Sequence, residues 1–231
     1  MHNEETITTP ASSHEMEEYS IDQAVPANSY LANWLLDLRT VEKPLNWKKI
    51  FGNTNKVELE VGCGTGMFIS QYAEDHPKVN LVGLDKCSGI VARSAQKTRR
   101  FELENVKLLR FEALYFVDEY VAPKSLQAIH CYYSDPWHKR SHYKRRLWQR
   151  PFLEACHKAL EEGGMLYMKT DVTDYYSAIQ KVFAASADLF EQVLSQRLDE
   201  VPLEGDYESN FQLKARAKGH PLYYEVWRKK H

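Results

Sequence analysis

The sequence of 231 residues has no long hydrophobic run and only four cysteines. No apolar stretch approaches the ~18 residues that a membrane span needs, and no basic start followed by an apolar stretch indicates a secretory signal. No two cysteines form a C-x-x-C pair, and each lies in or beside an expected apolar element: Cys63, Cys87, Cys131 and Cys156. We interpret them as small buried thiols of a reducing compartment, and we expect a cytoplasmic protein that binds neither metal nor membrane.

A large net charge is also missing, since 30 Lys and Arg against 32 Asp and Glu give a net charge of -2. The charge is nevertheless unevenly distributed. Residues 1–28 carry six acidic residues and no Lys or Arg, so the rest of the chain carries a net charge of +4. Six Lys or Arg lie between Lys139 and Arg150. Such local positive charge is typical of a surface that binds a polyanion.

The domain organisation follows from composition and periodicity. Residues 1–26 are rich in Glu, Ser and Thr and have no hydrophobic period, so we predict a disordered acidic tail. We expect residues 27–231 to form a single domain, because 43% apolar residues are ample for a packed core. The spacing of Leu31, Trp34, Leu35 and Leu38 predicts a short amphipathic helix over residues 29–38.

Strands and helices are expected to alternate after this segment. The predicted strands are 57–61, 79–84, 106–111, 126–133, 165–169 and 222–227. The predicted helices are 67–74, 89–102, 146–160, which ends at Gly163-Gly164, and 175–185. This order predicts an α/β fold with a mostly parallel central sheet, helices on both faces and a late antiparallel strand at one edge. Ligands of such sheets bind at the carboxyl ends of the strands.

A glycine-rich turn follows the first expected strand, with the pattern Glu60-x-Gly62-x-Gly64-x-Gly66. Glycines allow the backbone to turn tightly and to approach a ligand closely. A dinucleotide fingerprint requires glycine at the position of Met67, which argues against a nicotinamide or flavin cofactor. A plain strand-to-helix turn without a ligand is the alternative.

Acidic residues follow the next two expected strands. Asp85 can accept hydrogen bonds from both ribose hydroxyls of an adenosine, and Glu112-Ala113 can contact the adenine. Carboxylates would repel the phosphates of a nucleotide but suit a sulfonium cation. Glu60, Asp85, Glu112 and Asp135 therefore favour S-adenosylmethionine as the cofactor.

An aspartate, a tryptophan and a basic run follow the fourth expected strand, as Asp135-Pro-Trp-His-Lys139 and His142-x-Lys-Arg-Arg146. This order predicts a catalytic edge that opens onto a nucleic-acid surface. Trp137 is either a stacking surface for a flipped base or a core ring under the loop. No carboxylate–histidine spacing around His138 suits a metal.

The basic side chains at the expected start of helix 146–160 are Lys144, Arg145, Arg146 and Arg150. They are either a solvated helix start or ligands of phosphates. Positive charge at a helix N-terminus opposes the helix dipole, so a compensating partner is expected, and RNA phosphates would supply it.

Several motifs together resemble the bacterial tRNA (guanine-N7)-methyltransferase family, over a region from about Asn46 to the C-terminus. They are the glycine turn from Glu60 to Gly66, Asp135-Pro-Trp-His-Lys139 with its basic extension, Gln149-x-Pro-Phe152, Thr170-Asp171 and Phe211-x-x-Lys-x-x-x-x-Gly-His220. The resemblance implies a Rossmann-like class I methyltransferase. It further implies transfer of a methyl group from S-adenosylmethionine to N7 of a guanine in the tRNA variable loop.

The resemblance also implies roles for particular residues. Asp135 would serve catalysis, the cofactor or both. The cofactor would be bound by Glu60, Gly62, Gly64, Gly66, Asp85, Glu112, Ala113 and Asp135. The substrate would be bound by Lys139, Asp171, Ser209, Asn210, Phe211 and Gln212, and RNA by His138, Lys144, Arg145 and Arg146. We expect a monomer or a homodimer.

Four positions depart from the family pattern. Ser134 replaces a proline, Asp85 replaces a glutamate, Ser209 replaces a threonine, and Gln212 replaces a glutamate that the family places at the substrate. The alternatives are therefore a methyltransferase acting on another RNA or a small molecule, and a non-catalytic RNA-binding relative.

Overall fold

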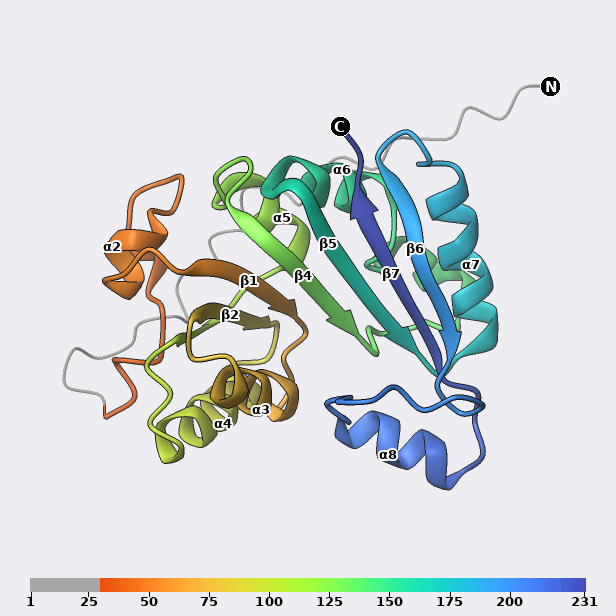
Figure 1. Ribbon diagram of the computed structural model, residues 1–231, viewed down its shortest axis with the longest axis horizontal. Helices are drawn as coiled ribbons and strands as arrows, with labels where there is room; N and C mark the ends of the chain where they lie inside the picture. The colour runs from red at the N-terminus through yellow and green to blue at the C-terminus, as the bar shows by residue number, and fades with distance from the viewer. Residues whose placement is uncertain (1–29) are drawn as a thin grey trace.

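The computed structural model describes residues 30–231, and the predicted acidic tail lies outside this range. Its centre is a seven-stranded sheet with the order β3-β2-β1-β4-β5-β7-β6 (Figure 1). The strands are β1 (Lys56–Val61), β2 (Val79–Asp85), β3 (Val106–Arg110), β4 (Leu126–Tyr132), β5 (Leu160–Thr170), β6 (Phe190–Arg197) and β7 (Tyr223–Lys229). The first five strands are parallel, and β7 runs antiparallel between β5 and the edge strand β6. The predicted sheet and its late antiparallel strand are confirmed.

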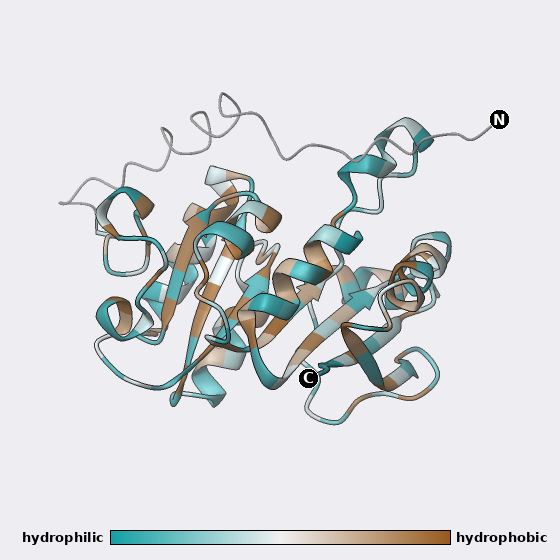
Figure 2. Ribbon diagram, turned by 90° about the horizontal axis from the view of Figure 1, so that it is seen from above, coloured by the Kyte–Doolittle hydropathy of each residue, from teal (hydrophilic) through white to brown (hydrophobic). Residues whose placement is uncertain are grey.

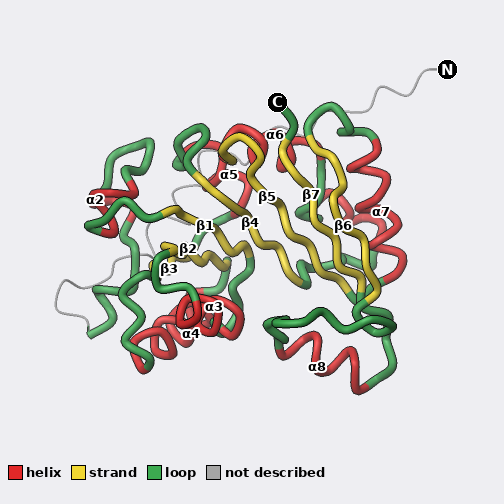
Figure 3. Tube along the Cα trace, in the orientation of Figure 1, coloured by secondary structure: helices red, strands yellow, loops and turns green. Residues whose placement is uncertain are grey.

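Helices cover both faces of the sheet (Figure 3). One face carries α3 (Met67–Asp75) and α4 (Ser88–Arg100), and the other carries α5 (Ala113–Glu119), α6 (Arg150–Ala159) and α7 (Thr173–Ala184). This arrangement is what right-handed crossovers produce when the chain first moves outward from β1 to β3 and then returns to β4. The shorter elements are η1 (Leu38–Thr40), α2 (Trp47–Phe51), η2 (Arg140–Arg145) and α8 (Asn210–Ala217).

The core lies between the sheet and its helices, and hydrophobic segments run through the strands and the packed helices (Figure 2). β1 is buried from its second residue to its last, as expected of a strand covered on both faces. From α6, Phe152, Leu153 and Cys156 are each at most 1% exposed and pack against this sheet. Among the described residues, no helix is long and apolar enough to cross a membrane.

The amphipathic helix predicted over residues 29–38 is wrong. Residues 30–34 form a turn, and Leu35 makes a parallel bridge to Leu108 of the edge strand β3. The backbone N–H of Leu36 donates to the carbonyl of Leu108, whose own N–H donates to the carbonyl of Trp34. The apolar side chains that suggested a helix therefore cover the edge of the sheet, because pairing with β3 satisfies backbone groups that a short helix would leave free.

The helix predicted over residues 146–160 is shorter at both ends. It begins at Arg150, with Pro151 in the first helical turn, where proline is favoured because its missing N–H is not needed. It ends at Ala159, and β5 follows directly, so the Gly163-Gly164 pair lies inside a strand. A Cβ at Gly164 would lie 2.9 Å from the carbonyl oxygen of Glu161. This glycine permits close backbone approach in β5 and does not end the helix.

Three of the four cysteines are buried, as predicted, but Cys87 is exposed. Cys87 precedes α4 at the carboxyl end of the sheet, and its backbone N–H donates to Asp85 at 3.0 Å. The prediction of a buried thiol at this position is therefore wrong, because the residue belongs to the turn and not to the strand before it.

Candidate functional site

The glycine turn is held against the end of the neighbouring strand. Gly62, Gly64 and Gly66 all have positive φ values, of 77°, 53° and 73°, which L side chains rarely adopt. The backbone N–H of Gly62 donates to the carbonyl of Leu84 at the end of β2, at 2.8 Å. A Cβ at Gly66 would lie 2.3 Å from the Oγ of Ser94 in α4. Glycine is therefore required here by the turn and by the close packing of α3 on α4.

Carboxylates follow β2 and β3 next to this turn. Asp85 accepts from the backbone N–H of Gly64 at 3.3 Å, so it is tied directly to the glycine turn. Glu112 caps α5 by accepting from the N–H of Tyr115 at 2.8 Å, and Ala113 is the buried first residue of that helix. The parallel register places the ends of β1, β2 and β3 at one edge of the sheet. The predicted cofactor residues are thus brought together.

Glu60 lies beneath the turn and is 4% exposed. Its Oε2 atom has no hydrogen-bond partner among the described residues. Burial, and then the charge of Asp85, raise the pKa of Glu60 to about 8. A buried carboxylate with an unsatisfied oxygen is costly unless a ligand pairs with it, so Glu60 fits the binding of a cationic group.

The segment after β4 presents Asp135 on a strained but anchored loop. Tyr133 and Trp137 have φ values of 54° and 43°, in the left-handed region, which non-glycine residues rarely adopt. Ser134 anchors the backbone, because its Oγ accepts from Trp148 Nε1 at 3.1 Å. The exposed carboxylate of Asp135 has no hydrogen bond or ion pair within residues 30–231. It is therefore free for a substrate or cofactor.

Asp171 follows β5, the strand next to β4, so the two carboxylates lie at neighbouring strand ends. The side chain of Asp171 is 27% exposed, and its carboxylate lies 3.7 Å from Nδ1 of His220. Both predicted guanine contacts thus lie at the same edge of the sheet as the glycine turn.

Trp137 is half-buried, so the alternative of a core ring does not hold. Its ring meets the ring of His142 edge-on at 5.5 Å, and the guanidinium of Arg145 lies 5.2 Å from its centre. Arg146 donates from Nε to the carbonyl of Pro136 at 2.7 Å, which fixes this loop to η2. His138, Lys139, Lys144 and Arg145 are exposed, and none of them has an acidic partner in the described part of the chain.

Most of the basic residues predicted at the start of helix 146–160 lie outside that helix, so the predicted conflict with its dipole is wrong for them. Lys144 and Arg145 belong to the 3-10 helix η2, and Arg146 lies in extended backbone. Only Arg150 lies at the start of α6, and its guanidinium already pairs with Glu154 and Asp188, each at 2.8 Å. No phosphate is needed to compensate the dipole of that helix.

In the C-terminal segment, Phe211 is exposed to solvent whereas Gln212 is buried. Phe211 is 63% exposed, and its ring stacks at 6.3 Å on Tyr133 beside the Asp135 loop. Gln212 is fully buried, and its Oε1 accepts from the Tyr133 hydroxyl at 3.1 Å and from Lys169 Nζ at 3.3 Å. Ser209 caps α8, and Asn210 is its exposed first residue. The side chain of Gln212 therefore faces the protein interior.

Sequence reasoning missed Asp206, whose carboxylate forms an ion pair with Lys169 and accepts from Gln212 Nε2. The side chains of Lys169 and Asp206 are only 4% and 11% exposed. The available signal was a lysine in an apolar strand, which requires a buried counter-charge.

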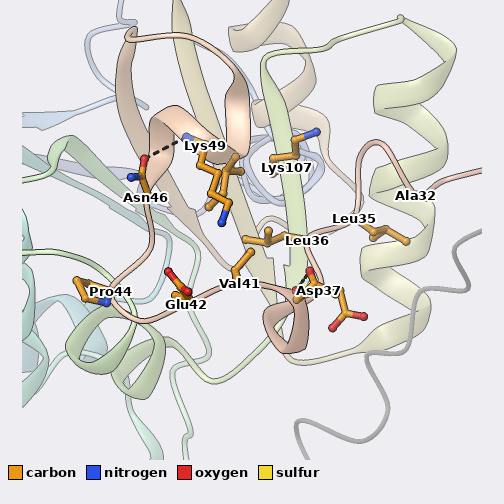
Figure 4. A pocket seen from close by; sticks show the side chains of 12 residues that line it. Ala32, Leu35, Leu36, Asp37, Val41, Glu42, Pro44, Asn46, Lys49 and Lys107 are labelled. Carbon is orange, nitrogen blue, oxygen red and sulfur yellow. Dashed lines mark hydrogen bonds between the residues drawn. The ribbon is translucent and has the colours of Figure 1, made fainter.

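A pocket of about 420 Å3 lies between η1, α2 and β3, and none of the predicted site residues lines it (Figure 4). Among the described residues, no group of three or more His, Cys, Asp or Glu could hold a metal ion.

Solved structures with the same fold include several methyltransferases. An antibiotic-related methyltransferase has a TM-score of 0.60 at 15% identity, covering 80% of this chain and 92% of its own. A Haemonchus contortus phosphoethanolamine N-methyltransferase, solved with S-adenosylhomocysteine, has a TM-score of 0.52 at 12% identity, covering 80% and 51%. Residues 54–224 match a family model described as a putative methyltransferase. The chain is a Rossmann-like class I methyltransferase.

Curated relatives define the family. The chain is 33% identical over 186 residues to a tRNA (guanine-N(7)-)-methyltransferase of Geobacter metallireducens, covering 80% of this chain and 88% of the relative. It is also 33% identical over 177 residues to the Bacillus subtilis protein of the same name, covering 77% and 82%. The chain belongs to the tRNA (guanine-N7)-methyltransferase family, and the resemblance inferred from the motifs is confirmed.

Proposed function

We propose that this protein transfers a methyl group from S-adenosylmethionine to N7 of a guanine in the variable loop of tRNA. The observation that carries the proposal is the unpaired, exposed carboxylate of Asp135, which lies at the same sheet edge as the glycine turn and begins a basic surface. The names of the curated relatives support the tRNA guanine as substrate. A tRNA substrate also favours a cytoplasmic location.

The residues at the glycine turn fit S-adenosylmethionine, which would supply the methyl group as a sulfonium electrophile. Asp85 would accept from the ribose hydroxyls, and Glu112 with Ala113 would flank the adenine. The orphan oxygen of buried Glu60 fits the positive charge of the same molecule. A nucleoside triphosphate fits less well, because Glu60, Asp85 and Glu112 would all repel its phosphates.

Guanine N7 carries a free lone pair at neutral pH, so the protein needs no general base. Catalysis then depends on aligning the base with the methyl donor and on stabilising the positive charge that develops on the ring. Asp135 would accept from the N1–H and N2–H groups of the guanine or offset this charge, and Asp171 would provide a second contact. Lys139 and the unpaired cations of η2 would hold the RNA backbone.

The direct test is nucleoside mass spectrometry of an unmodified tRNA transcript incubated with the protein and S-adenosylmethionine. We expect one 7-methylguanosine per tRNA, located in the variable loop after nuclease mapping. Methylation of another nucleoside, or of no RNA at all, would contradict the proposal.

The raised pKa of Glu60 gives a pH prediction. Between its ordinary pKa of 4.5 and about 8, the folded protein holds a proton that the unfolded chain releases, so the stability of the cofactor-free protein falls as pH rises. Binding of a cation favours the ionised carboxylate, so the affinity for S-adenosylmethionine should rise by up to about tenfold per pH unit between about pH 6 and 8. Calorimetry at three pH values checks this. Glu60→Gln should abolish the pH dependence of the affinity for S-adenosylmethionine. A wild-type affinity that does not change between pH 6 and 8 would contradict the prediction.

A further inference from the structure

A groove of about 600 Å3 lies between α3 and α4, next to the glycine turn. Thr65 and Met67 line the end of the groove that adjoins the turn, so it continues directly from the cofactor edge of the sheet. Figure 1 shows α3 and α4 side by side on the same face of the sheet. None of the residues assigned above to the cofactor or to guanine lines it.

One wall of the groove is a stripe of positive charge. Arg93, Lys97 and Arg100 are spaced by four and three residues on α4, which places them on one side of that helix. They extend along about 10 Å of the helix axis, since each residue advances the helix by ~1.5 Å. None of the three forms an ion pair within residues 30–231, and Glu74 is the only acidic residue of the lining. The groove therefore keeps a net positive charge.

The remaining lining suits the other chemical groups of a nucleic acid. Gln71 and Gln96 are exposed; the Gln96 amide nitrogen donates to the Tyr30 hydroxyl at 3.4 Å, and its amide oxygen remains available as an acceptor. Ser70 is 3% exposed, and its Oγ has no hydrogen-bond partner among the described residues. At the end away from the turn, the ring of Phe101 is 48% exposed, as expected of a side chain available for stacking on a base.

We propose that this groove binds the sugar-phosphate backbone of the RNA substrate, as a second RNA contact on the opposite side of the glycine turn from η2. The inference rests on the proposed function. A single small anion would need only one of the three cations, whereas a polyanion uses the whole stripe. The groove would position the tRNA over the cofactor without touching the reacting base.

The test is a triple variant, Arg93→Gln with Lys97→Gln and Arg100→Gln. We expect the KM for a tRNA transcript to rise at least tenfold. The slope of log KM against log salt should fall by about 2, because each lost phosphate contact removes about 0.7–0.9. The kcat at saturating tRNA and the affinity for S-adenosylmethionine should stay within twofold of the wild type.

The matched control is Lys48→Gln with Lys78→Gln and Lys181→Gln, which removes the same charge from three exposed lysines outside the groove. A groove variant whose KM and salt slope equal those of this control would overturn the inference while leaving the proposed function intact. A wild-type protein that forms no 7-methylguanosine in tRNA would instead overturn the proposed function. A groove variant that loses kcat but keeps the wild-type KM would also overturn the inference.

Discussion

Replacing Asp135 by alanine is expected to lower kcat for tRNA methylation by about 10²–10³, the range typical of removing one positioned electrostatic group. The carboxylate is the unpaired group at the strand end, and it would orient the guanine or offset its developing charge. Because the side chain is exposed and makes no hydrogen bond within residues 30–231, the free energy of unfolding should change by less than about 0.5 kcal/mol. Activity and stability should therefore separate in this variant.

Single-turnover kinetics with saturating tRNA and cofactor measure the effect on the chemical step, and calorimetry measures cofactor affinity. Asp135→Asn distinguishes the two roles of the residue. The amide keeps the size of the side chain but removes its charge, so a loss as large as that of Asp135→Ala assigns the effect to charge. Glu42→Ala, an exposed acid at the remote pocket, is the control and should leave kcat unchanged. Near-normal kcat in Asp135→Ala would remove this residue from the mechanism.

The sequence alone predicts those strands and helices that are set by the local pattern of apolar residues. The strands β1, β2 and β4 are buried along most of their length, and enough of their residues are apolar to predict them, although buried polar residues such as Glu58, Asn80 and His130 interrupt the pattern. The ends of parallel strands meet at one edge, so the sequence alone assigns Glu60, Asp85 and Asp135 to one site. At this site the residue types suited to a cofactor coincide with the strand ends that the parallel topology brings together.

The errors arose where distant contacts decide the structure. Leu35 has a helical spacing to its neighbours, yet its backbone pairs with Leu108, which lies 73 residues away. Gln212 is predicted at the substrate from its place in a motif, and the motif did not reveal that its buried amide bonds to Tyr133, Lys169 and Asp206. No periodicity in the segment that contains Asp206 marks it as the partner of a buried lysine. Such pairings depend on tertiary packing, which a single sequence does not display.

The buried amide of Gln212 suggests how the C-terminal segment is held. Lys169 lies at the end of β5, and its ammonium group is 5.0 Å from the centre of the Tyr132 ring and forms an ion pair with Asp206. Burial lowers the pKa of Lys169, and the charge of Asp206 opposes this shift. Gln212 links the pair to Tyr133, on which the exposed ring of Phe211 stacks. The ion pair thus fixes α8 next to the loop that carries Asp135.

Replacing Asp206 by asparagine is expected to destabilise the protein by about 3–5 kcal/mol, because it leaves the buried ammonium of Lys169 without a counter-charge. Chemical denaturation measures this loss, and assays well below the transition should show a higher KM for tRNA with cofactor affinity unchanged. Glu191→Gln removes an acid from a pair with Arg228 that is 46% exposed on both sides, so it should cost at most about 1 kcal/mol.

The informative variant combines Asp206→Asn with Gln212→Glu. The carboxylate then moves from position 206 to position 212 and stays beside Lys169, because Gln212 Oε1 already lies 3.3 Å from the ammonium nitrogen. We expect the double variant to recover most of the lost stability and tRNA affinity, whereas Gln212→Glu alone should be destabilising, since it places a second carboxylate beside Asp206. Independent, additive effects of the two substitutions would show that the charge at Lys169 is not what holds the C-terminal segment in place.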